Sequence, residues 1–282
     1  MNNLVQQSKE WLEFRQNKIG SSDAPVIMEV SPWKTQFQLW EEKIGVRKQY
    51  KTEAMQRGLE LENKARSVFE TKTNLCMLPE VINHPQFDWM IASLDGIDIG
   101  RKHIVEIKCA GSQDHSLAKE GKVPEKYYPQ IQHQLEVCGL EMAYYFSFDG
   151  EDGVIVEVEK DQKYIDEMVV KEEEFWKRIL DFSPPETSLR DYNIRSDDMW
   201  VKVCEEWKEV YSKLKELETK EKDLRESIIH LTNNQNTRGG GIQVSKVIRQ
   251  GNVEYSKIPE LQGINLNLYR KKPTEYWKIA SV

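Results

Sequence analysis

Two short stretches, Ser93–Gly96 (SLDG) and Glu106–Lys108 (EIK), decide the fold of this chain. The residues between them are typical of a β-hairpin, with Asp95 near the end of one strand and Glu106 and Lys108 on the next. Side chains of a strand alternate faces with a period of two, so Glu106 and Lys108 point the same way. Folding the hairpin brings Asp95 to that face. Two carboxylates and one ammonium then converge, as a phosphodiester hydrolase that uses a divalent metal requires.

A short D…ExK pattern also occurs by chance, and a solvent-facing hairpin with an exposed Glu and Lys is the alternative interpretation. The neighbours Ile104, Val105 and Ile107 make the second strand apolar. Glu106 and Lys108 are therefore charges in a buried context, and buried charges must be paired or bind a metal.

Further motifs flank this hairpin in a fixed order. Upstream lie W-x-x-x-R at 11–15, I-G-S-S-D at 19–23, S-P-W-x-T at 31–35 and R-G-x-x-x-E at 57–62. Downstream of the E-x-K-C motif lies Y-x-Q-x-Q at 128–132. Residues 53–74 have apolar positions at helical spacing, and a second helix opens near Tyr127, with Pro129 in its first turn.

This ordered set resembles the YqaJ-type viral recombinases, the phage lambda exonuclease branch of the PD-(D/E)xK nucleases. The resemblance covers about residues 8 to 160. It implies a Mg²⁺-dependent exonuclease, with Mn²⁺ as a substitute, that resects one strand of double-stranded DNA from its 5′ end. It also implies a single-strand-annealing partner protein and, by analogy, a closed homo-oligomer, most simply a trimer.

The resemblance implies roles for individual residues. Asp95 and Glu106 match the metal-binding carboxylates, with the Ile107 carbonyl as a further ligand, and Lys108 matches the catalytic lysine. The remaining matches are Glu62 (support of metal-bound water, with Glu60 as the alternative), Gln130 (active-site glutamine, with Gln132 behind it), Arg15 and Ser22 (5′-phosphate binding) and Lys34, which stands where the lambda enzyme has a second arginine. Lysine lacks the bidentate fork of arginine, so dependence on a 5′-phosphate stays open.

Structural alternatives exist for several of these residues. Arg15 could pair with an acid on its own helix, Trp11 is expected in the core, and Ser22-Asp23 could be no more than a helix N-cap. Gln130 could lie on the surface. The five histidines show no metal-ligand spacing, and His133, near Gln130 and Gln132, is the one of interest. At the level of function, the alternatives are a restriction-type endonuclease on the same core and a DNA-end-binding recombination module whose nuclease centre is vestigial.

Composition limits the protein class. The 282 residues carry a net charge of −7, yet a local basic channel is compatible with that balance. Its candidates are Lys34, Arg57, Lys64, Lys119, Lys122 and Lys126, each with a solvated surface charge as the alternative. No membrane span or signal peptide is evident, and the four scattered cysteines indicate buried free thiols in a reducing compartment. The expected location is the cytoplasm of a bacterial host, encoded by a phage or prophage.

The fold class predicted is α/β (α+β): a PD-(D/E)xK restriction-endonuclease-like core, with a central mixed sheet flanked by helices, a C-terminal long helix and a small β appendage. Strands are expected at 75–81, 88–94, 97–100, 103–109, 142–148 and 153–158, and a helix at 161–181. The predicted domains are a core at 1–182, a linker at 183–196, a long amphipathic helix at 197–237 and a basic β appendage at 238–282.

The long helix at 197–233 carries a seam spaced alternately by three and four residues: Trp200, Val203, Trp207, Val210, Leu214, Leu217, Glu221, Leu224, Ile228 and Leu231. Such a seam packs either against residues 161–181 of the same chain or in an intermolecular coiled coil. Residues 238–282 hold 8 bases against 3 acids, with strands expected at 242–248 and 252–255. This basic, aromatic tail is expected to add DNA affinity or, alternatively, to cover the seam with strands at 242–248 and Tyr276–Ile279.

Overall fold

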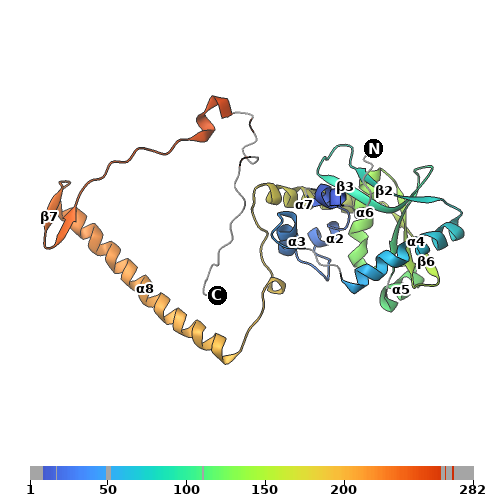
Figure 1. The fold of residues 1–282 in the computed structure, drawn as a ribbon, viewed down its shortest axis with the longest axis horizontal. Coiled ribbons are helices and arrows are strands. Elements are labelled where there is room, and N and C mark those ends of the chain that lie inside the picture. Colours follow the sequence, from blue (N-terminus) through green and yellow to red (C-terminus); the bar gives the residue numbers. More distant parts are fainter. Residues whose placement is uncertain are drawn as a thin grey trace. The chain divides into compact units, whose positions relative to one another are not determined.

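The computed structural model describes residues 9–16, 18–48, 52–109, 111–261, 264 and 269. These residues form two compact units, one that ends at Asn193 and one that begins at Ile194 (Figure 1). The first unit combines a mixed sheet with helices, and the second contains a long helix followed by a small hairpin.

The first unit contains both helices and strands. Its helices are α1 (Lys9–Gln16), α2 (Ala24–Ile27), α3 (Gln36–Lys43), α4 (Glu53–Thr73), α5 (Ser112–Lys119), α6 (Tyr128–Cys138) and α7 (Gln162–Leu180). Its strands are β1 (Ile19–Gly20), β2 (Met77–Asn83), β3 (Met90–Asp98), β4 (Ile104–Lys108), β5 (Met142–Phe148) and β6 (Gly153–Glu159), and 3₁₀ turns lie at Glu125–Tyr127 and Leu189–Asp191.

The six strands form one mixed sheet in the order β1-β3-β4-β5-β6, with β2 also paired to β3. The pairs β2–β3, β3–β4 and β5–β6 are antiparallel, and β1–β3 and β4–β5 are parallel. Residue Ile91 pairs with both β1 and β2, and Ile97 pairs with both β2 and β4. Since β2 occupies one edge of β3 at both points, β1 and β4 share the opposite edge.

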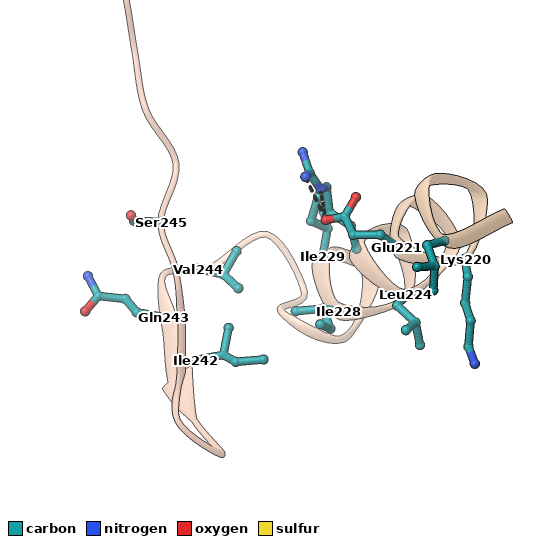
Figure 2. Close-up of a pocket in the computed structure, with 11 residues that line it drawn as sticks. Lys220, Glu221, Leu224, Ile228, Ile229, Ile242, Gln243, Val244 and Ser245 are labelled. Atoms are coloured by element: carbon teal, nitrogen blue, oxygen red, sulfur yellow. Dashed lines mark hydrogen bonds and ion pairs between the residues drawn. The ribbon is translucent and has the colours of Figure 1, made fainter. Parts of the chain in front are cut away.

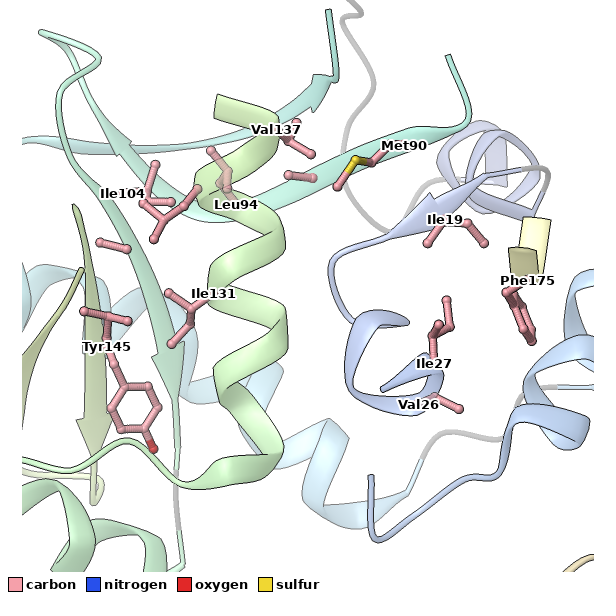
Figure 3. Packing of buried hydrophobic residues seen from close by; sticks show 14 of the residues in the cluster. Ile19, Val26, Ile27, Met90, Leu94, Ile104, Ile131, Val137, Tyr145 and Phe175 are labelled. Atoms are coloured by element: carbon pink, nitrogen blue, oxygen red, sulfur yellow. The ribbon is translucent and has the colours of Figure 1, made fainter. Parts of the chain in front are cut away.

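Helices cover both faces of this sheet. The larger core cluster lies between the sheet and α6, where Leu94, Ile104 and Tyr145 of the strands gather around Ile131 (Figure 3). A second cluster lies under α4 and contains Phe69, and a third joins α2 to α7 through Ala24, Ile165 and Met168. Complete burial of one such side chain stabilises the fold by about 1.5–3 kcal/mol. The sheet is thus a rigid platform for the side chains at its strand ends.

The predicted fold class is confirmed, as are most element positions, including the strand at 142–148. One difference concerns Gly96, because the strands expected at 88–94 and 97–100 form one continuous strand, β3. Gly96 is packed too tightly for a side chain: an added Cβ would lie 2.8 Å from Met77 Cβ and 2.9 Å from Val105 Cγ1. The glycine marks close packing rather than a turn, and Asp95 therefore lies inside β3.

The cysteines are all free, but the expectation that they are buried is wrong for Cys76, which is exposed. Cys76 lies in the short connection between α4 and β2, outside both apolar clusters. Cys109, Cys138 and Cys204 are partly exposed. Burial raises the pKa of Cys138 to about 12, which keeps it a thiol at neutral pH.

Residues 183–193, expected to be part of a linker, are held to the first unit. Arg190 donates to the carbonyl of Pro32 at 2.8 Å, and the Thr35 hydroxyl donates to Asp191 at 2.5 Å. These bonds fix the segment against the start of α3. The compact unit therefore continues to Asn193.

The second unit begins with α8 (Asp198–Leu231), a helix of 34 residues. The Asp197 side chain caps it by accepting from the Trp200 amide at 3.2 Å. A two-stranded hairpin follows, β7 (Thr237–Gly239) and β8 (Ile242–Val244), and 3₁₀ turns lie at Tyr255–Lys257 and Pro259–Leu261.

The appendage differs from the prediction. The strand expected at 242–248 ends at Val244, it pairs with β7, and no strand forms at 252–255. Gly240 and Gly241 have positive φ angles of 56° and 78°, which is the backbone of a tight hairpin turn. The predicted strand Tyr276–Ile279 lies outside the described residues. No helix in the described part of the chain is long and apolar enough to span a membrane.

Candidate active site

The site lies at a gap in the sheet. On the edge of β3 that β1 and β4 share, β4 pairs only with Gly96 and Ile97, and β1 pairs only with Met90 and Ile91. Residues 92–95 between these contacts have no neighbouring strand on that edge among the described residues. The gap brings the side chain of Asp95 next to β4.

Side chains satisfy the backbone groups that the gap leaves without strand partners. Asp95 Oδ2 accepts a hydrogen bond from the Ile107 amide at 2.8 Å, and the Asp95 carbonyl accepts one from Arg66 Nε at 2.8 Å. Buried backbone groups need such partners, because an unpaired one costs as much as a lost hydrogen bond. Asp95 and Arg66 therefore stabilise the opening between β3 and β4.

Glu106 is the most enclosed acid of the site, with only 1% of its surface exposed. Its Oε1 lies 2.5 Å from Lys108 Nζ and accepts from Gln130 Nε2 at 2.7 Å. Its Oε2 accepts from Gln134 Nε2 at 2.5 Å. The period-two prediction is thus confirmed in geometry: Glu106 and Lys108 share a face, and α6 covers that face.

The charged groups at the gap shift one another's pKa values. Burial raises the pKa of Asp95 well above its usual value, and the negative charge of Glu106 raises it further. Burial alone would lower the pKa of Lys108, but the carboxylates of Glu106 and Asp95 raise it above the ordinary lysine value. Lys108 is therefore a firmly held cation, and its ammonium also lies 5.1 Å from the centre of the Tyr127 ring.

Glu62 borders the gap from α4. Its Oε1 lies 2.6 Å from Arg66 Nη2, and its negative charge contributes to the raised pKa of Asp95. The alternative, Glu60, is exposed and accepts from Gln56 on the helix surface at 3.0 Å. The structure thus places Glu62, and not Glu60, beside the other acids.

The glutamines of α6 divide into two faces. Gln130 and Gln134 face the sheet and hold the two oxygens of Glu106, and Gln130 Oε1 also accepts from Lys108 Nζ at 3.2 Å. Gln132 points elsewhere, donating to the Glu159 carbonyl at 2.8 Å. Gln134 and Arg66 are site residues that sequence reasoning missed. The signal for Gln134 was its spacing of four residues from Gln130, which puts both on one helix face.

The predicted phosphate pocket is assembled in part. The Arg15 guanidinium donates to the Ser22 hydroxyl and lies 3.7 Å from Asp23 Oδ1. Burial alone would raise the pKa of Asp23, but Lys43 and Arg15 lower it to about 2, so it stays ionised. Asp23 stands at the N-cap position of α2 but makes no side-chain capping bond there. Lys34 is engaged elsewhere, with its ammonium 2.5 Å from Glu42.

Trp11 and His133 have structural positions beside these groups. Trp11 is 8% exposed, as expected for a core residue, and Arg15 lies 5.1 Å from its ring centre. His133 is fully buried, 2.8 Å from Glu172 of α7 and 2.9 Å from the Ile91 carbonyl. It therefore joins α6 to α7 and β3 and does not reach the gap.

The lysines proposed for a basic channel have different surroundings. The ammonium of Lys126 lies near the rings of Trp33 and Tyr127, 5.2 and 5.3 Å from their centres, and pairs with Asp114 at 2.8 Å. Lys64 donates to the Gly150 carbonyl, Lys122 pairs with Glu120, and Arg57 and Lys119 are exposed. Of these candidates, Lys126 is the one that shares a contact with the active-site lysine, because Lys126 and Lys108 both lie against the ring of Tyr127.

The donors at the gap suit a hard divalent cation. Asp95 and Glu106 offer carboxylate oxygens and Ile107 a carbonyl, the ligands that Mg²⁺ prefers. Burial and the charges of Glu106 and Glu62 raise the pKa of Asp95 more than the charge of Lys108 lowers it, and a nearby divalent cation would also lower it. Within the described residues, however, no three His, Cys, Asp or Glu side chains are arranged to hold a metal. Glu62, the third acid, is paired with Arg66, so metal binding stays a prediction.

Comparisons with known proteins point to one family. Residues 10–141 match the family model of the YqaJ-like viral recombinase domain. The protein YqaJ of Bacillus subtilis (strain 168) is 33% identical over 174 residues, which are 59% of this chain and 54% of that protein. The chain thus spans about half the length of this relative. The resemblance predicted from the motifs is confirmed for the region that carries them.

Solved structures agree with this assignment. The alkaline exonuclease LHK-Exo from Laribacter hongkongensis has a TM-score of 0.55 and 26% identity, covering 62% of this chain and 94% of that one. The structure of LHK-Exo in complex with dAMP has the same TM-score and coverage at 24% identity, which supports the fold alone. The first unit therefore has the fold of this alkaline exonuclease.

Proposed function

We propose that this protein is a Mg²⁺-dependent exodeoxyribonuclease that resects one strand of linear double-stranded DNA from its 5′ end. One observation carries the proposal: Asp95, Glu106 and Lys108 converge at the gap between β3 and β4. The YqaJ-like domain and the likeness to an alkaline exonuclease support it. In the proposed role the chain takes part in single-strand-annealing recombination.

Each group at the gap has a proposed task. Asp95, Glu106 and the Ile107 carbonyl would hold the cation. When bound, such an ion polarises the scissile phosphate and lowers the pKa of a water molecule. The raised pKa of Lys108 keeps its ammonium protonated, so Lys108 is better suited to stabilise anionic charge at the phosphate than to accept a proton. Gln130 orients Lys108 by accepting from it and Glu106 by donating to it.

Glu62 is the proposed acceptor for the proton of the attacking water. It borders Asp95, and its partner Arg66 also fixes the Asp95 carbonyl. Arg15 and Ser22 are proposed to anchor the 5′-phosphate, because a guanidinium and a hydroxyl side by side donate charge-assisted hydrogen bonds to an anion. Lys34 belongs to this anchor only if it leaves Glu42.

The proposal includes partners and a location. The substrate is the end of a DNA duplex, and a single-strand-annealing protein is the proposed partner for the exposed strand. A closed trimeric ring would retain the DNA between cleavage steps. The proposed location is the cytoplasm of a bacterial host, in keeping with a phage-type recombinase.

A digestion assay tests the function. Linear duplex labelled at the 5′ or the 3′ end and closed circular duplex are incubated with the protein, with and without Mg²⁺. We expect early release of the 5′ label from linear DNA in Mg²⁺ alone. Cleavage of the circle would favour the restriction-type endonuclease, and intact DNA in every lane would favour the vestigial DNA-end-binding module.

Variants test the site within the same assay. Asp95→Asn, Glu106→Gln and Lys108→Met should each lower the rate on the order of 10²-fold or more, because each removes a charge at the reacting phosphate. Glu60→Gln is the matched control, since Glu60 is exposed on the surface of the same helix as Glu62. Near-wild-type rates for any of the three variants would show that the gap is not the active site.

A further inference from the structure

Most of the seam of α8 is exposed. Val210, Leu217 and Leu224 are 66%, 64% and 55% exposed, and no residue of α8 is buried. A helix gains most of its stability from packing its apolar face. Exposed apolar surface of this extent in a stable helix marks an interaction site.

A groove lies at the C-terminal half of this helix. It has a volume of about 760 Å³ and is lined on α8 by Leu217, Leu224 and Ile228 and on β8 by Ile242 and Val244. Figure 2 shows Ile242 and Val244 pointing across the groove toward Ile228. The groove therefore offers apolar side chains from two walls, with space between them for large side chains.

The N-terminal half of the same helix presents large side chains. Trp200 and Trp207 belong to the seam, and the ring of Tyr211 stacks on Trp207 with centres 4.8 Å apart. Trp200 is 47% exposed and Tyr211 39%. One half of α8 thus projects aromatic rings and the other half forms a groove, so the helix is complementary to a reversed copy of itself.

We propose that two copies of this chain associate through α8 as an antiparallel pair of helices, related by a two-fold axis between Leu214 and Leu217. All ten seam positions then meet in a–d layers. The layers are Trp200 with Leu231, Val203 with Ile228, Trp207 with Leu224, Val210 with Glu221, and Leu214 with Leu217, the second residue of each coming from the partner subunit. The interface is isologous and closes on itself.

Glu221 sets the direction of the pair. In a parallel pair in register, the two Glu221 side chains would meet in one apolar layer, and like charges there repel. In the antiparallel pair each Glu221 lies opposite Val210 of the partner subunit, so the two Glu221 side chains do not meet. A parallel pair would also place each tryptophan against the same tryptophan of the partner subunit rather than against the groove.

The seam is large enough for a stable dimer. At about 1.5 Å per residue, α8 is roughly 50 Å long. Nine of its ten seam residues are apolar, and roughly 70 Å² removed from each in both copies reaches the about 1,200 Å² of a specific interface.

Mass measurements on the full chain test the association. Leu214→Glu combined with Leu217→Glu puts four charges at the centre of the pair, and should halve the mass measured by light scattering. The matched control is Ser212→Glu with Thr219→Glu, which adds the same charge on the opposite face of the helix and should leave the mass unchanged. Equal masses for wild type and the seam variant would overturn the proposal, whatever the oligomeric state of the first unit.

Cross-linking of the full chain tests the direction. In a background with alanine at Cys76, Cys109, Cys138 and Cys204, and with a wild-type mass, one protein carries Val203→Cys and another Ile228→Cys. After subunit exchange, mild oxidation should link the two proteins to each other and neither to itself, since like positions would be roughly 37 Å apart. Self-linking of either protein would show parallel helices, and no link in the mixture would show that the chain itself covers the seam.

Discussion

At the scale of residues, the contacts of Arg15 decide whether it can bind the 5′-phosphate of DNA. Its guanidinium lies over the Trp11 ring, reaches the Ser22 hydroxyl and stands 3.7 Å from Asp23. Because Asp23 is also paired with the buried Lys43 at 2.6 Å, it neutralises Arg15 only in part. The remaining donors of Arg15 are suited to an anion such as a terminal phosphate.

Arg15→Ala should slow digestion of 5′-phosphorylated duplex and reduce its rate advantage over 5′-hydroxyl duplex by about tenfold or more, since bonds to a charged group contribute about 1.5–3 kcal/mol. Arg15→Lys should restore only part of the advantage, because lysine cannot form the bidentate fork. Rates are compared on the same duplex with either end. Equal wild-type rates on both ends would contradict the phosphate anchor.

The sequence predicted the residues that follow a local rule. Glu106 and Lys108 share a strand face by alternation, and the structure brings them to 2.5 Å. Arg66 could not be predicted in this way, because its contact with Asp95 depends on how α4 crosses β3. Gln134 does follow the helical rule, but it is one of three glutamines on α6, with Gln130 and Gln132, and the rule alone does not say which of them contact Glu106.

At the scale of elements, α6 is joined to α7 by a buried ion pair. Burial alone would lower the pKa of His133, but the negative charge of Glu172 raises it above the usual value. Glu172 Oε2 has no hydrogen-bond partner among the described residues. His84, whose pKa is lowered by burial first and also by the charge of His133, differs from His133 in this respect.

The raised pKa predicts a loss of stability at alkaline pH. A base whose pKa is higher in the folded state stabilises the fold fully below its unfolded value of about 6.5, and that contribution falls as pH rises through the folded value. The free energy of unfolding should therefore fall above about pH 6.5, by no more than about 1.4 kcal/mol per pH unit for one proton. Urea unfolding at several pH values measures it.

Glu172→Gln is the variant that isolates this pair. A glutamine amide can donate to neutral His133, so the variant should lose stability below pH 6.5 and show a flatter curve above it. Glu173→Gln, on the exposed next position of α7, is the control. A wild-type curve that is flat between pH 6.5 and 9 would contradict an ionised His133.

The positions of helices and strands were easier to predict from the sequence than the residues at which they begin and end. The apolar run at 142–148 and the periodic helices were found because each pattern is local. The joining of two expected strands into β3, and the end of β8 at Val244, depend on partners distant in sequence or on a glycine turn. The patterns of single segments do not contain that information.

At the scale of the whole molecule, the two units differ in how they are stabilised. Every buried apolar side chain among the described residues lies between Trp11 and Ile179. The first unit therefore contains the hydrophobic core, and the second presents an amphipathic helix without a core of its own.

A chain of residues 1–193 should accordingly fold and keep its site. We expect its melting temperature to differ from that of the full chain by less than about 4 °C, or about 1 kcal/mol, and its single-turnover cleavage at saturating protein to be unchanged. Calorimetry and a rapid-quench assay measure the two quantities. A truncated chain that aggregates or is inactive would show that residues 194–282 complete the first unit. Its mass would also report whether the first unit alone forms the proposed ring.

The hydrogen bond from the Ile107 amide to the Asp95 carboxylate has a consequence for spectroscopy. The amide finds its acceptor in a side chain that can rotate, whereas most strand amides bond to fixed carbonyls. When the carboxylate turns away, toward a cation or another donor, this amide loses its shield from solvent deuterium. The hydrogen-exchange rate and the ¹⁵N chemical shift of the Ile107 amide therefore report the orientation of the Asp95 carboxylate, and both can be measured in the absence of DNA.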